Sequence, residues 1–462
     1  MNQYQSALST RYGSTAMRDI FSDHNKYRQW RRCWLALAKA QQQLGLDITD
    51  EQIAQLEANV EHIDLKRAAH YEEKFQHDVM AQLYVYGDQA PLAKGILHLG
   101  ATSAFVSDNG ELLSQLEAMR IIQSTLTQII TQFAKQANTY ANMPAVGFTH
   151  YQQAQPTTFG KRLALYLQDF VTDMDQLVHW LETFQLRGAK GTTGSQASYL
   201  MLFDQDHQKV QQLDQLVASH LNMDATFLIT GQTYPRKRDS FTLNVLSGLA
   251  QSAHKFAVDV RLMQHDGIIA EPFGTHQIGS SAMAYKRNPI LSEKICGLSR
   301  KVMIDALNGP MTAANQWLER SLDDSSNRRL VLAEAFITVD EILMSVLKII
   351  EGMVVFPHKI QDQLNQYLPF LATEPLLMAI ATKGGDRQLW HEHIRQQSMQ
   401  VIQAQQHPNQ LIKQLQAIED FPLSEQELSQ IMQPSQFVGL AQQQTQAYIE
   451  SIKHYIKESY YD

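Results

Sequence analysis

Apolar residues recur every three or four positions over four long stretches of this chain. The stretches are residues 119–140, 163–184, 246–260 and 329–352. This spacing places apolar side chains on one face of a helix, so each stretch predicts a long helix. The last stretch is apolar nearly all round, as expected for a helix buried on several sides. Four such helices predict a bundle, and we expect other subunits to complete the burial of the 329–352 helix.

The helical pattern changes its character twice along the chain. Before about residue 100 the apolar stretches are shorter, and after "VVFPHKI" (354–360) the chain becomes rich in glutamine. The glutamines alternate with Ile, Leu and Phe at helical spacing, which favours a folded region over a low-complexity tail. We therefore expect an all-α chain of three domains: residues 1–102, a central long-helix bundle over 103–355, and residues 356–462.

Composition narrows the class of protein. The chain has 462 residues with 22 Gly and 13 Pro, a smaller share than the usual ~12 %, which fits long uninterrupted helices. Its net charge of −8 makes nucleic acid an unexpected partner. Two distant cysteines, Cys33 and Cys296, exclude a disulfide framework and fit a reducing compartment. The first residues lack the apolar core of a signal peptide, and the most apolar stretch, residues 335–356, holds four charges. We expect a cytoplasmic protein without a membrane partner.

Five polar segments interrupt or border the helical stretches. They are "QHDVMA" (76–81), "HLGATSAFVSDN" (98–109), "GFTHYQQAQPTTFGKR" (147–162), "GSSAMAYKRNPILSEK" (279–294) and "LERSLDDSSNRR" (318–329). Each alone has a structural explanation: Thr102 and Ser103 are typical helix caps, a lone His150 is usually a hydrogen-bonded structural residue, and "NRR" is typical of a solvated helix face. Together they place hydroxyl, imidazole and guanidinium groups beside rigid helices, which favours one composite pocket.

The segment 279–289 follows neither a strand nor a helix period and predicts an exposed loop. Asn288 and Pro289 are typical of a helix cap and a first helical position, so the positive end of that helix would point at the loop. Because Lys286 and Arg287 add charge, the loop predicts an anion site with serines as candidate proton carriers. The glycine-rich segment 188–198 lacks the residue order of a P-loop, and no Cys/His set has metal-ligand spacing. We expect no metal and no cofactor.

The loop sequence "GSSAMAYKRNP" resembles the signature of the fumarase/aspartase superfamily, GSSxMPxKxNP. "HLGATSAFVSDN" and "THYQQAQPTT" resemble the other two shared regions, in the form found in the adenylosuccinate lyase family. Segments such as "KGTTGSQASYL", "ITGQTYPRK" and "LDDSSNRRLVLAEAF" extend the similarity over nearly the whole chain. The resemblance is closest to the branch that contains the animal enzymes.

This resemblance implies an all-α, three-domain subunit of a homotetramer built around a shared helical bundle. It implies a carbon–nitrogen lyase of purine biosynthesis that eliminates fumarate from two substrates. Adenylosuccinate would give AMP, and succinyl-aminoimidazole-carboxamide ribotide would give AICAR. The implied partners are these small nucleotides, with active sites that take residues from several subunits.

The resemblance also assigns roles to residues. Ser280 matches the base, and His150 matches the general acid with Glu293 as its charge partner. A serine is a weak base, so Lys286, backbone amides and the helix end must stabilise its alkoxide. The residues implied to be catalytic are His77, His150, Ser280, Lys286 and Glu293. The residues implied to bind substrate are Arg11, Tyr12, Gln76, His77, Asp78, Thr102, Ser103, Gln232, Lys286, Asn288, Lys294, Arg320, Ser325 and Arg329.

Four positions depart from the family pattern. Ala284 stands where the signature has proline, and Gln153 replaces a proline after "THYQ". Gln76 and Lys294 stand where the animal-like enzymes have arginine, so each lacks a bidentate donor near the substrate. The alternatives are another lyase of the superfamily, such as argininosuccinate lyase or a cycloisomerase, and a catalytically silent helical scaffold. "HLGATS" argues against the former lyase and His150 against the cycloisomerase. Retention of Ser280, Lys286, His150 and Glu293 argues against the scaffold.

Overall fold

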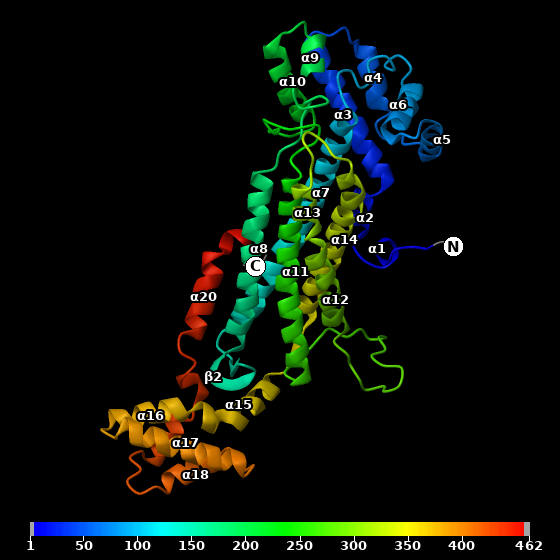
Figure 1. The fold of residues 1–462 in the computed structure, drawn as a ribbon. Coiled ribbons are helices and arrows are strands. Elements are labelled where there is room, and N and C mark those ends of the chain that lie inside the picture. Colours follow the sequence, from blue (N-terminus) through cyan, green and yellow to red (C-terminus); the bar gives the residue numbers. More distant parts are fainter. Residues whose placement is uncertain (1–3, 457–462) are drawn as a thin grey trace. The chain divides into compact units, whose positions relative to one another are not determined.

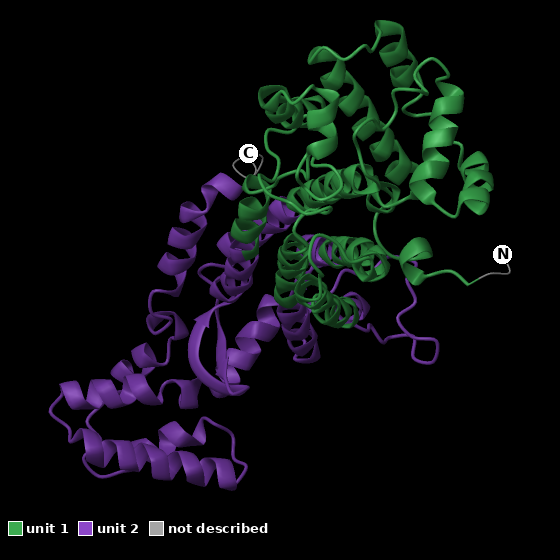
Figure 2. Cartoon of the chain, turned by 45° about the horizontal axis from the view of Figure 1, so that its top comes forward, with its two compact units in different colours: residues 1–125, 173–253, 295–344 green, residues 126–172, 254–294, 345–462 purple. Residues whose placement is uncertain are grey.

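Residues 4–456 are described by the computed structural model, and the chain divides into two units that are each discontinuous in sequence (Figure 2). Unit 1 comprises residues 1–125, 173–253 and 295–344. Unit 2 comprises residues 126–172, 254–294 and 345–462. The candidate site residues are therefore described unit by unit.

Long helices form the middle of the chain, as the apolar spacing predicts (Figure 1). They are α7 (Ser103–Thr139), α8 (Phe159–Glu182), α11 (Lys237–His265), α12 (Ile290–Asp305) and α14 (Asp323–Gly352). Each of the four apolar stretches lies in one of them, although the first two stretches end one and two residues beyond their helix. The periodic positions of the first, from Met119 to Ala137, are fully buried. Each long helix passes from one unit into the other along its length.

Helices α7, α8 and α11 contact one another within each of the two units, which confirms the predicted helical bundle. In unit 2 the ring of Phe133 on α7 lies 5.5 Å from that of Phe170 on α8 and 5.0 Å from that of Phe256 on α11, measured between centroids. In unit 1 the indole N–H of Trp180 on α8 donates to the hydroxyl of Thr242 on α11 at 3.0 Å. The Thr242 hydroxyl in turn donates to Gln115 on α7 at 3.1 Å.

Over its central part, from about residue 335 to 346, helix α14 is largely buried within the single chain. Ala335, Phe336, Val339, Ile342 and Leu343 have no exposed surface. The central part of α14 is thus buried without another subunit, whereas Leu330 near its start remains exposed. That other subunits complete the bundle stays a prediction.

Apart from α3 (Asp23–Gln43), which has 21 residues, the other helices of unit 1 have at most 14 residues. They are α1 (Ala7–Thr10), α2 (Thr15–Ile20), α4 (Asp50–Ala58), α5 (Leu65–Phe75), α6 (Asp78–Gln89), α9 (Ala197–Leu202), α10 (His207–His220) and α13 (Asn308–Ala314). Helix α3 begins at the side chain of Ser22, which accepts the N–H of Asn25, and packs against α10. Its Trp30 and Trp34 are buried, and the ring of Trp34 lies 6.1 Å from that of Tyr86 on α6 in a tilted arrangement.

The glutamine-rich end of the chain is folded in unit 2. Its helices are α15 (Pro357–Leu371), α16 (Thr373–Thr382), α17 (Arg387–Gln403), α18 (Gln410–Gln416), α19 (Glu425–Ile431) and α20 (Ala441–Ser451), with 3-10 turns at Pro434–Gln436 and Lys453–Tyr455. Val401, Leu411 and Leu415 are buried in one apolar cluster with Trp390. The prediction of a folded helical region, made from the spacing of Ile, Leu and Phe among the glutamines, is thereby confirmed.

Two small antiparallel sheets in unit 2 were not predicted. The strands β1 (Pro144–Thr149) and β2 (Gln152–Thr158) form a hairpin, and β3 (Ile269–Ala270) pairs with β4 (Val354–Val355). At a register shift in the hairpin, a Cβ on Gly147 would lie 2.4 Å from the carbonyl oxygen of Gln155. Glycine is therefore required where the strands approach this closely.

Cys33 and Cys296 are both buried, and neither is part of a disulfide within residues 4–456. Within residues 4–456, no helix combines the length and the apolar character needed to cross a membrane.

Candidate active site

In unit 1, His77 and Ser103 meet where three helices begin or end. Gln76 ends α5 with a left-handed backbone, φ 52°, and His77 caps α6 by accepting the N–H of Met80 on Nδ1 at 3.3 Å. Since Nδ1 is an acceptor, a neutral His77 carries its proton on Nε2, which lies 3.4 Å from the hydroxyl of Ser103. Asp78 lies beside the ring, with its Oδ1 3.8 Å from Nδ1. Thr102 immediately precedes α7, so Thr102 and Ser103 stand at a helix start, as their cap-like sequence predicts.

His98 is a second histidine near His77. Its Nδ1 accepts the indole N–H of Trp34 at 2.9 Å, and its backbone is left-handed, with φ 66°. Burial lowers the pKa of His98 to about 4, and the neighbouring His77 adds to that effect. His98 is therefore neutral at physiological pH, with its proton on Nε2.

The segment of Arg11 and Tyr12 is tied to α14 through backbone groups. The N–H of Gly13 donates to Glu341 at 2.9 Å, and the N–H of Ser14 donates to Asp340 at 2.6 Å. A Cβ on Gly13, whose φ is 76°, would lie 2.7 Å from a methyl of Ile337. Contact with α14 therefore fixes the backbone next to Arg11 and Tyr12.

Gln232 lies against the segment that carries Arg320. Its N–H donates to the carbonyl of Glu319 at 3.0 Å, and its carbonyl accepts from the guanidinium of Arg187 at 2.7 Å. Arg320 extends along its own chain to Asp324, 3.4 Å away. Unit 1 thus brings Gln232 and Arg320 into one neighbourhood, with Ser325 and Arg329 on the first turns of α14.

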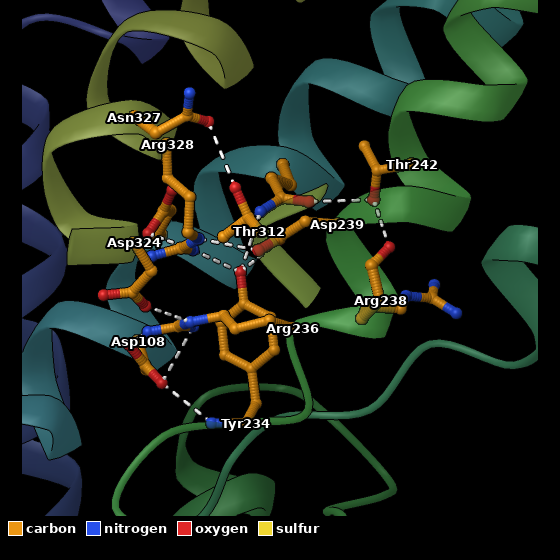
Figure 3. A network of polar contacts seen from close by, with 12 residues as sticks. Asp108, Tyr234, Arg236, Arg238, Asp239, Thr242, Thr312, Asp324, Asn327 and Arg328 are labelled. Carbon is orange, nitrogen blue, oxygen red and sulfur yellow. Dashed lines mark hydrogen bonds and ion pairs between the residues drawn. The ribbon is translucent and has the colours of Figure 1, made fainter. Parts of the chain in front are cut away.

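A buried arginine, Arg236, joins the starts of α7 and α14 (Figure 3). Its guanidinium donates to both carboxylate oxygens of Asp108, at 3.0 and 3.3 Å, and to Asp324 at 2.5 Å. Burial opposes ionisation of Asp108, but Arg236, Arg328 and Arg187 hold its pKa below the usual value. Asp324 is followed by Ser325, and Asp108 lies on the helix that begins at Ser103, so this ion pair fixes two proposed substrate-binding segments relative to each other.

A second buried arginine extends the network. Arg328 donates to Asp239 at 2.6 Å, to Glu111 at 2.7 Å and to the hydroxyl of Tyr234 at 2.5 Å (Figure 3). Burial raises the pKa of Glu111, although Arg328 opposes that shift. The interpretation of "NRR" as a solvated face is wrong for Arg328, which is buried, and right for Arg329, which is exposed. A charged residue inside an apolar stretch, such as Asp108 in "AFVSDN", is the sequence signal for such a network.

In unit 2, His150 stands at the tip of the β1–β2 hairpin. His150 and Tyr151 form its two-residue turn, and both have positive φ, 51° and 56°. Turns of this type favour Asn and Gly, so a histidine followed by a tyrosine is strained there. The turn leaves the His150 side chain exposed in the single chain.

Ser280 lies in the loop between β3 and α12, also in unit 2. Its Oγ accepts the backbone N–H groups of Ala282 at 3.3 Å and Met283 at 3.1 Å. Two donors aimed at one hydroxyl oxygen stabilise negative charge on it. Lys286 is exposed on the same loop, and the side-chain amide of Asn288 donates to the carbonyl of Gly279 at 3.0 Å.

The N-terminus of α12 is not an open anion site, which corrects the sequence-based expectation. The carboxylate of Glu271 accepts the N–H groups of Leu291 at 3.0 Å and Ser292 at 2.8 Å, together with the hydroxyl of Ser292. The side chain of Asn288 bonds to Gly279 rather than capping the helix. The N–H of Glu293 donates to the carbonyl of Pro289. No sequence pattern relates Glu271 to a helix that begins far beyond it.

Glu293 and Lys294 lie on the first turn of α12, in unit 2. Within residues 4–456, His150 and Glu293 form no hydrogen bond or ion pair with each other. The candidate catalytic residues thus fall in two groups: His77 in unit 1, and His150, Ser280, Lys286 and Glu293 in unit 2.

Comparison with solved structures defines the class of protein. The fold matches that of 3-carboxy-cis,cis-muconate lactonizing enzyme from Pseudomonas putida, with TM-score 0.85, 23 % identity and coverage of 98 % of this chain and 100 % of that one. It also matches fumarate lyase from Mesorhizobium sp. BNC1, with TM-score 0.83, 21 % identity and coverage of 97 % and 99 %. The fold is that of the fumarase/aspartase superfamily, and a "Lyase" family model matches residues 10–304.

Closer relatives identify the family. Adenylosuccinate lyase of Schizosaccharomyces pombe is 44 % identical over 96 % of this chain and 94 % of its own length, and that of Saccharomyces cerevisiae is 42 % identical over 97 % and 94 %. That of Schistosoma mansoni is 39 % identical over 97 % and 95 %. Residues 369–448 match the model "Adenylosuccinate lyase C-terminus". The chain belongs to the adenylosuccinate lyase family, as the sequence motifs predict.

Proposed function

We propose that this chain catalyses β-elimination of fumarate from adenylosuccinate, giving AMP, and from succinyl-aminoimidazole-carboxamide ribotide, giving AICAR. Its similarity to adenylosuccinate lyases extends over nearly the full length of each chain. The observation that carries the chemistry is the pair of backbone N–H groups donating to the Oγ of Ser280.

In the proposed reaction, the Ser280 alkoxide removes a proton from the carbon next to a substrate carboxylate. The electron pair delocalises into that carboxylate and gives a doubly charged aci-carboxylate. It then forms the carbon–carbon double bond of fumarate while the carbon–nitrogen bond breaks. The departing nitrogen keeps the bonding pair and takes a proton from His150. Ser280 ends protonated and His150 deprotonated, and proton exchange with solvent restores both.

Stabilisation of the Ser280 alkoxide is assigned to groups of its own loop. The N–H groups of Ala282 and Met283 supply two donors, and Lys286 supplies a charge. The positive end of α12 is left out of this role, because Glu271 already accepts its first free N–H groups. The field around Ser280 therefore depends on the conformation of the loop.

Substrate binding is assigned by position. Lys286, Asn288, Thr102 and Ser103 would hold the carboxylates. Gln232 would make a further contact with the substrate. Arg11, Tyr12, Arg320, Ser325 and Arg329 would hold the nucleotide end, where arginine suits phosphate because its planar guanidinium donates two parallel hydrogen bonds. His77 and Asp78 would orient substrate near the phosphate, with Gln76 and Lys294 beside it. Support comes from the contacts of His77 with Ser103 and of Gln232 with the Arg320 segment.

We further propose a homotetramer whose active sites take residues from several subunits, with Glu293 as charge partner of a His150 from another chain. Large apolar side chains are exposed over residues 304–330 of unit 1, among them Ile304, Met311, Trp317 and Leu322. Several large exposed apolar side chains close together in sequence are a reason to expect a protein interface there. A cytoplasmic location and the three domains 1–102, 103–355 and 356–462 belong to the same proposal. The two buried cysteines outside any disulfide support the location.

The test is an ultraviolet absorbance assay of the purified chain with adenylosuccinate, and argininosuccinate serves as the comparison substrate. We expect turnover of adenylosuccinate alone, with fumarate and AMP released in equal amounts. A folded chain that leaves adenylosuccinate intact would support a silent scaffold, and cleavage of argininosuccinate would support a different lyase.

A further inference from the structure

The loop that carries Ser280 contains a folded inner part. A Cβ on Gly279 would lie 2.0 Å from the carbonyl oxygen of Lys286, so the backbone at 279 lies directly against that at 286. Asn288 donates to the carbonyl of Gly279, and the N–H of Lys286 donates to the carbonyl of Met283 at 3.0 Å. Residues 279–288 therefore form a closed ring of chain that holds Ser280 and Lys286 together.

Both ends of the loop meet at a single side chain, Gln264, in the last turn of α11. Its Oε1 accepts the backbone N–H of Glu271 at 2.9 Å, where the chain leaves β3. Its Nε2 donates to the carbonyl of Arg287 at 3.0 Å, where the chain approaches α12. One amide group thus connects the start of the loop with its end.

Two further contacts strengthen this base. The guanidinium of Arg287 lies 5.0 Å from the ring centroid of Phe273, so the first and last parts of the loop also contact each other through side chains. The buried carboxylate of Glu271 holds the first turn of α12. Gln264 bonds to the backbone of Glu271 and so connects the start of α12 to the end of α11.

We propose that Gln264 is a positioning residue that fixes the base of the catalytic loop, so that the 279–288 ring moves as a body and Ser280 returns to one position. This inference rests on the proposed function for its catalytic consequence, whereas the mechanical part holds for the loop itself. The side-chain amide of Gln264 bonds to backbone groups at both ends of the loop, and no role in contacting substrate is assigned to it.

The test compares two substitutions in the full-length protein by hydrogen–deuterium exchange. Gln264→Leu removes both hydrogen bonds at nearly constant shape. Gln264→Glu keeps the acceptor for the Glu271 N–H but turns an oxygen toward the Arg287 carbonyl. We expect Gln264→Leu to speed exchange about tenfold over peptides covering 270–289, equivalent to about 1.4 kcal/mol. Gln264→Glu should speed exchange mainly over 284–289.

Kinetics supply the second readout. We expect kcat for adenylosuccinate to fall about tenfold or more in Gln264→Leu, because misplacing a reacting group by about 1 Å is costly. The Kd for AMP alone should be unchanged, because the residues proposed to hold the nucleotide end lie outside the loop. The control is Gln251→Leu on the same helix. Its amide donates to Ser247 of that helix, so this substitution should change neither readout.

Unchanged exchange over 270–289 in Gln264→Leu would overturn the proposal, even if activity fell. Faster exchange with an unchanged kcat would overturn its catalytic part. If the unaltered protein does not cleave adenylosuccinate, the proposed function fails, and exchange still decides whether Gln264 fixes the loop.

Discussion

Ser280 and His150 are the two side chains on which the proposed reaction depends most. We expect Ser280→Ala and His150→Ala each to lower kcat by about 10²–10⁴, the range for a positioned acid or base. Because His150 has a positive φ, His150→Asn serves as a matched variant: asparagine tolerates this backbone but cannot donate the proton. Steady-state rates with adenylosuccinate measure the effect, and activity within threefold of the unaltered protein removes that residue from the mechanism.

Ala284 occupies the second position of a turn closed by the hydrogen bond from Lys286 N–H to Met283 O. Proline is favoured at this position, so Ala284→Pro should fit without strain and stabilise the folded loop by about 0.4–1 kcal/mol. Limited proteolysis of the unliganded protein within 274–288 should slow. In contrast, Ala282→Pro removes an N–H that donates to Ser280 and should lower kcat. Equal or faster cleavage of Ala284→Pro would contradict this role of the missing proline.

His98 should make stability depend on pH. Its pKa is about 4 in the folded chain, against about 6.5 when unfolded. The unfolded state binds the proton first, so the contribution of neutral His98 is complete above pH 6.5 and is lost as the pH falls toward 4. The loss amounts to about 3 kcal/mol at most. A protonated ring would also turn an N–H toward the indole N–H of Trp34.

The matched variant is His98→Asn, which tolerates the left-handed backbone and still offers an acceptor to Trp34. Urea unfolding at several pH values should show a shallower decline between pH 6.5 and 4 in this variant. An identical decline in both proteins would show that His98 is not the group responsible.

At the scale of elements, the ion pairs of Arg236 join α7 to α14. Arg236→Met leaves Asp108 and Asp324 buried without their shared partner, and breaking a buried pair in this way costs about 3–5 kcal/mol. The control is Arg395→Met, since Arg395 pairs with Glu392 on the surface of α17 and its loss should change stability little. Urea unfolding measures both. Equal effects of the two substitutions would show that the buried network does not hold these helices.

At the scale of the whole molecule, the prediction concerns the sharing of active sites. If His150 and Ser280 of one site come from different chains, mixing His150→Ala with Ser280→Ala should restore activity. With equal random mixing, a given site receives both intact residues with a chance of one half times one half, so roughly a quarter of full activity should return. Native mass spectrometry of tagged subunits confirms exchange. Exchanged tetramers that remain at the mutants' baseline would exclude shared sites.

The sequence by itself determined the helices and the residues of the motifs. Helical spacing depends on neighbours three and four positions apart, so the pattern from Met119 to Ala137 predicts both the helix and its buried face. The loop at 279–289 was predicted for the same reason, since it follows neither period. The motifs also predicted the family, and the similarity to relatives over nearly the full length confirms it.

Only the tertiary structure decided which polar groups are already in use, because hydrogen bonds between distant segments leave no local pattern. Arg328 and Arg329 are adjacent, yet contacts with Asp239 and Glu111 bury the first and leave the second exposed. The 144–158 hairpin forms through pairing between its two strands, and its polar turn, His150 and Tyr151, has none of the residues that usually predict a hairpin turn. From the sequence alone, the N-terminus of α12 is predicted to be an open anion site. In the folded chain the carboxylate of Glu271 accepts its N–H groups, because buried N–H groups must find an acceptor.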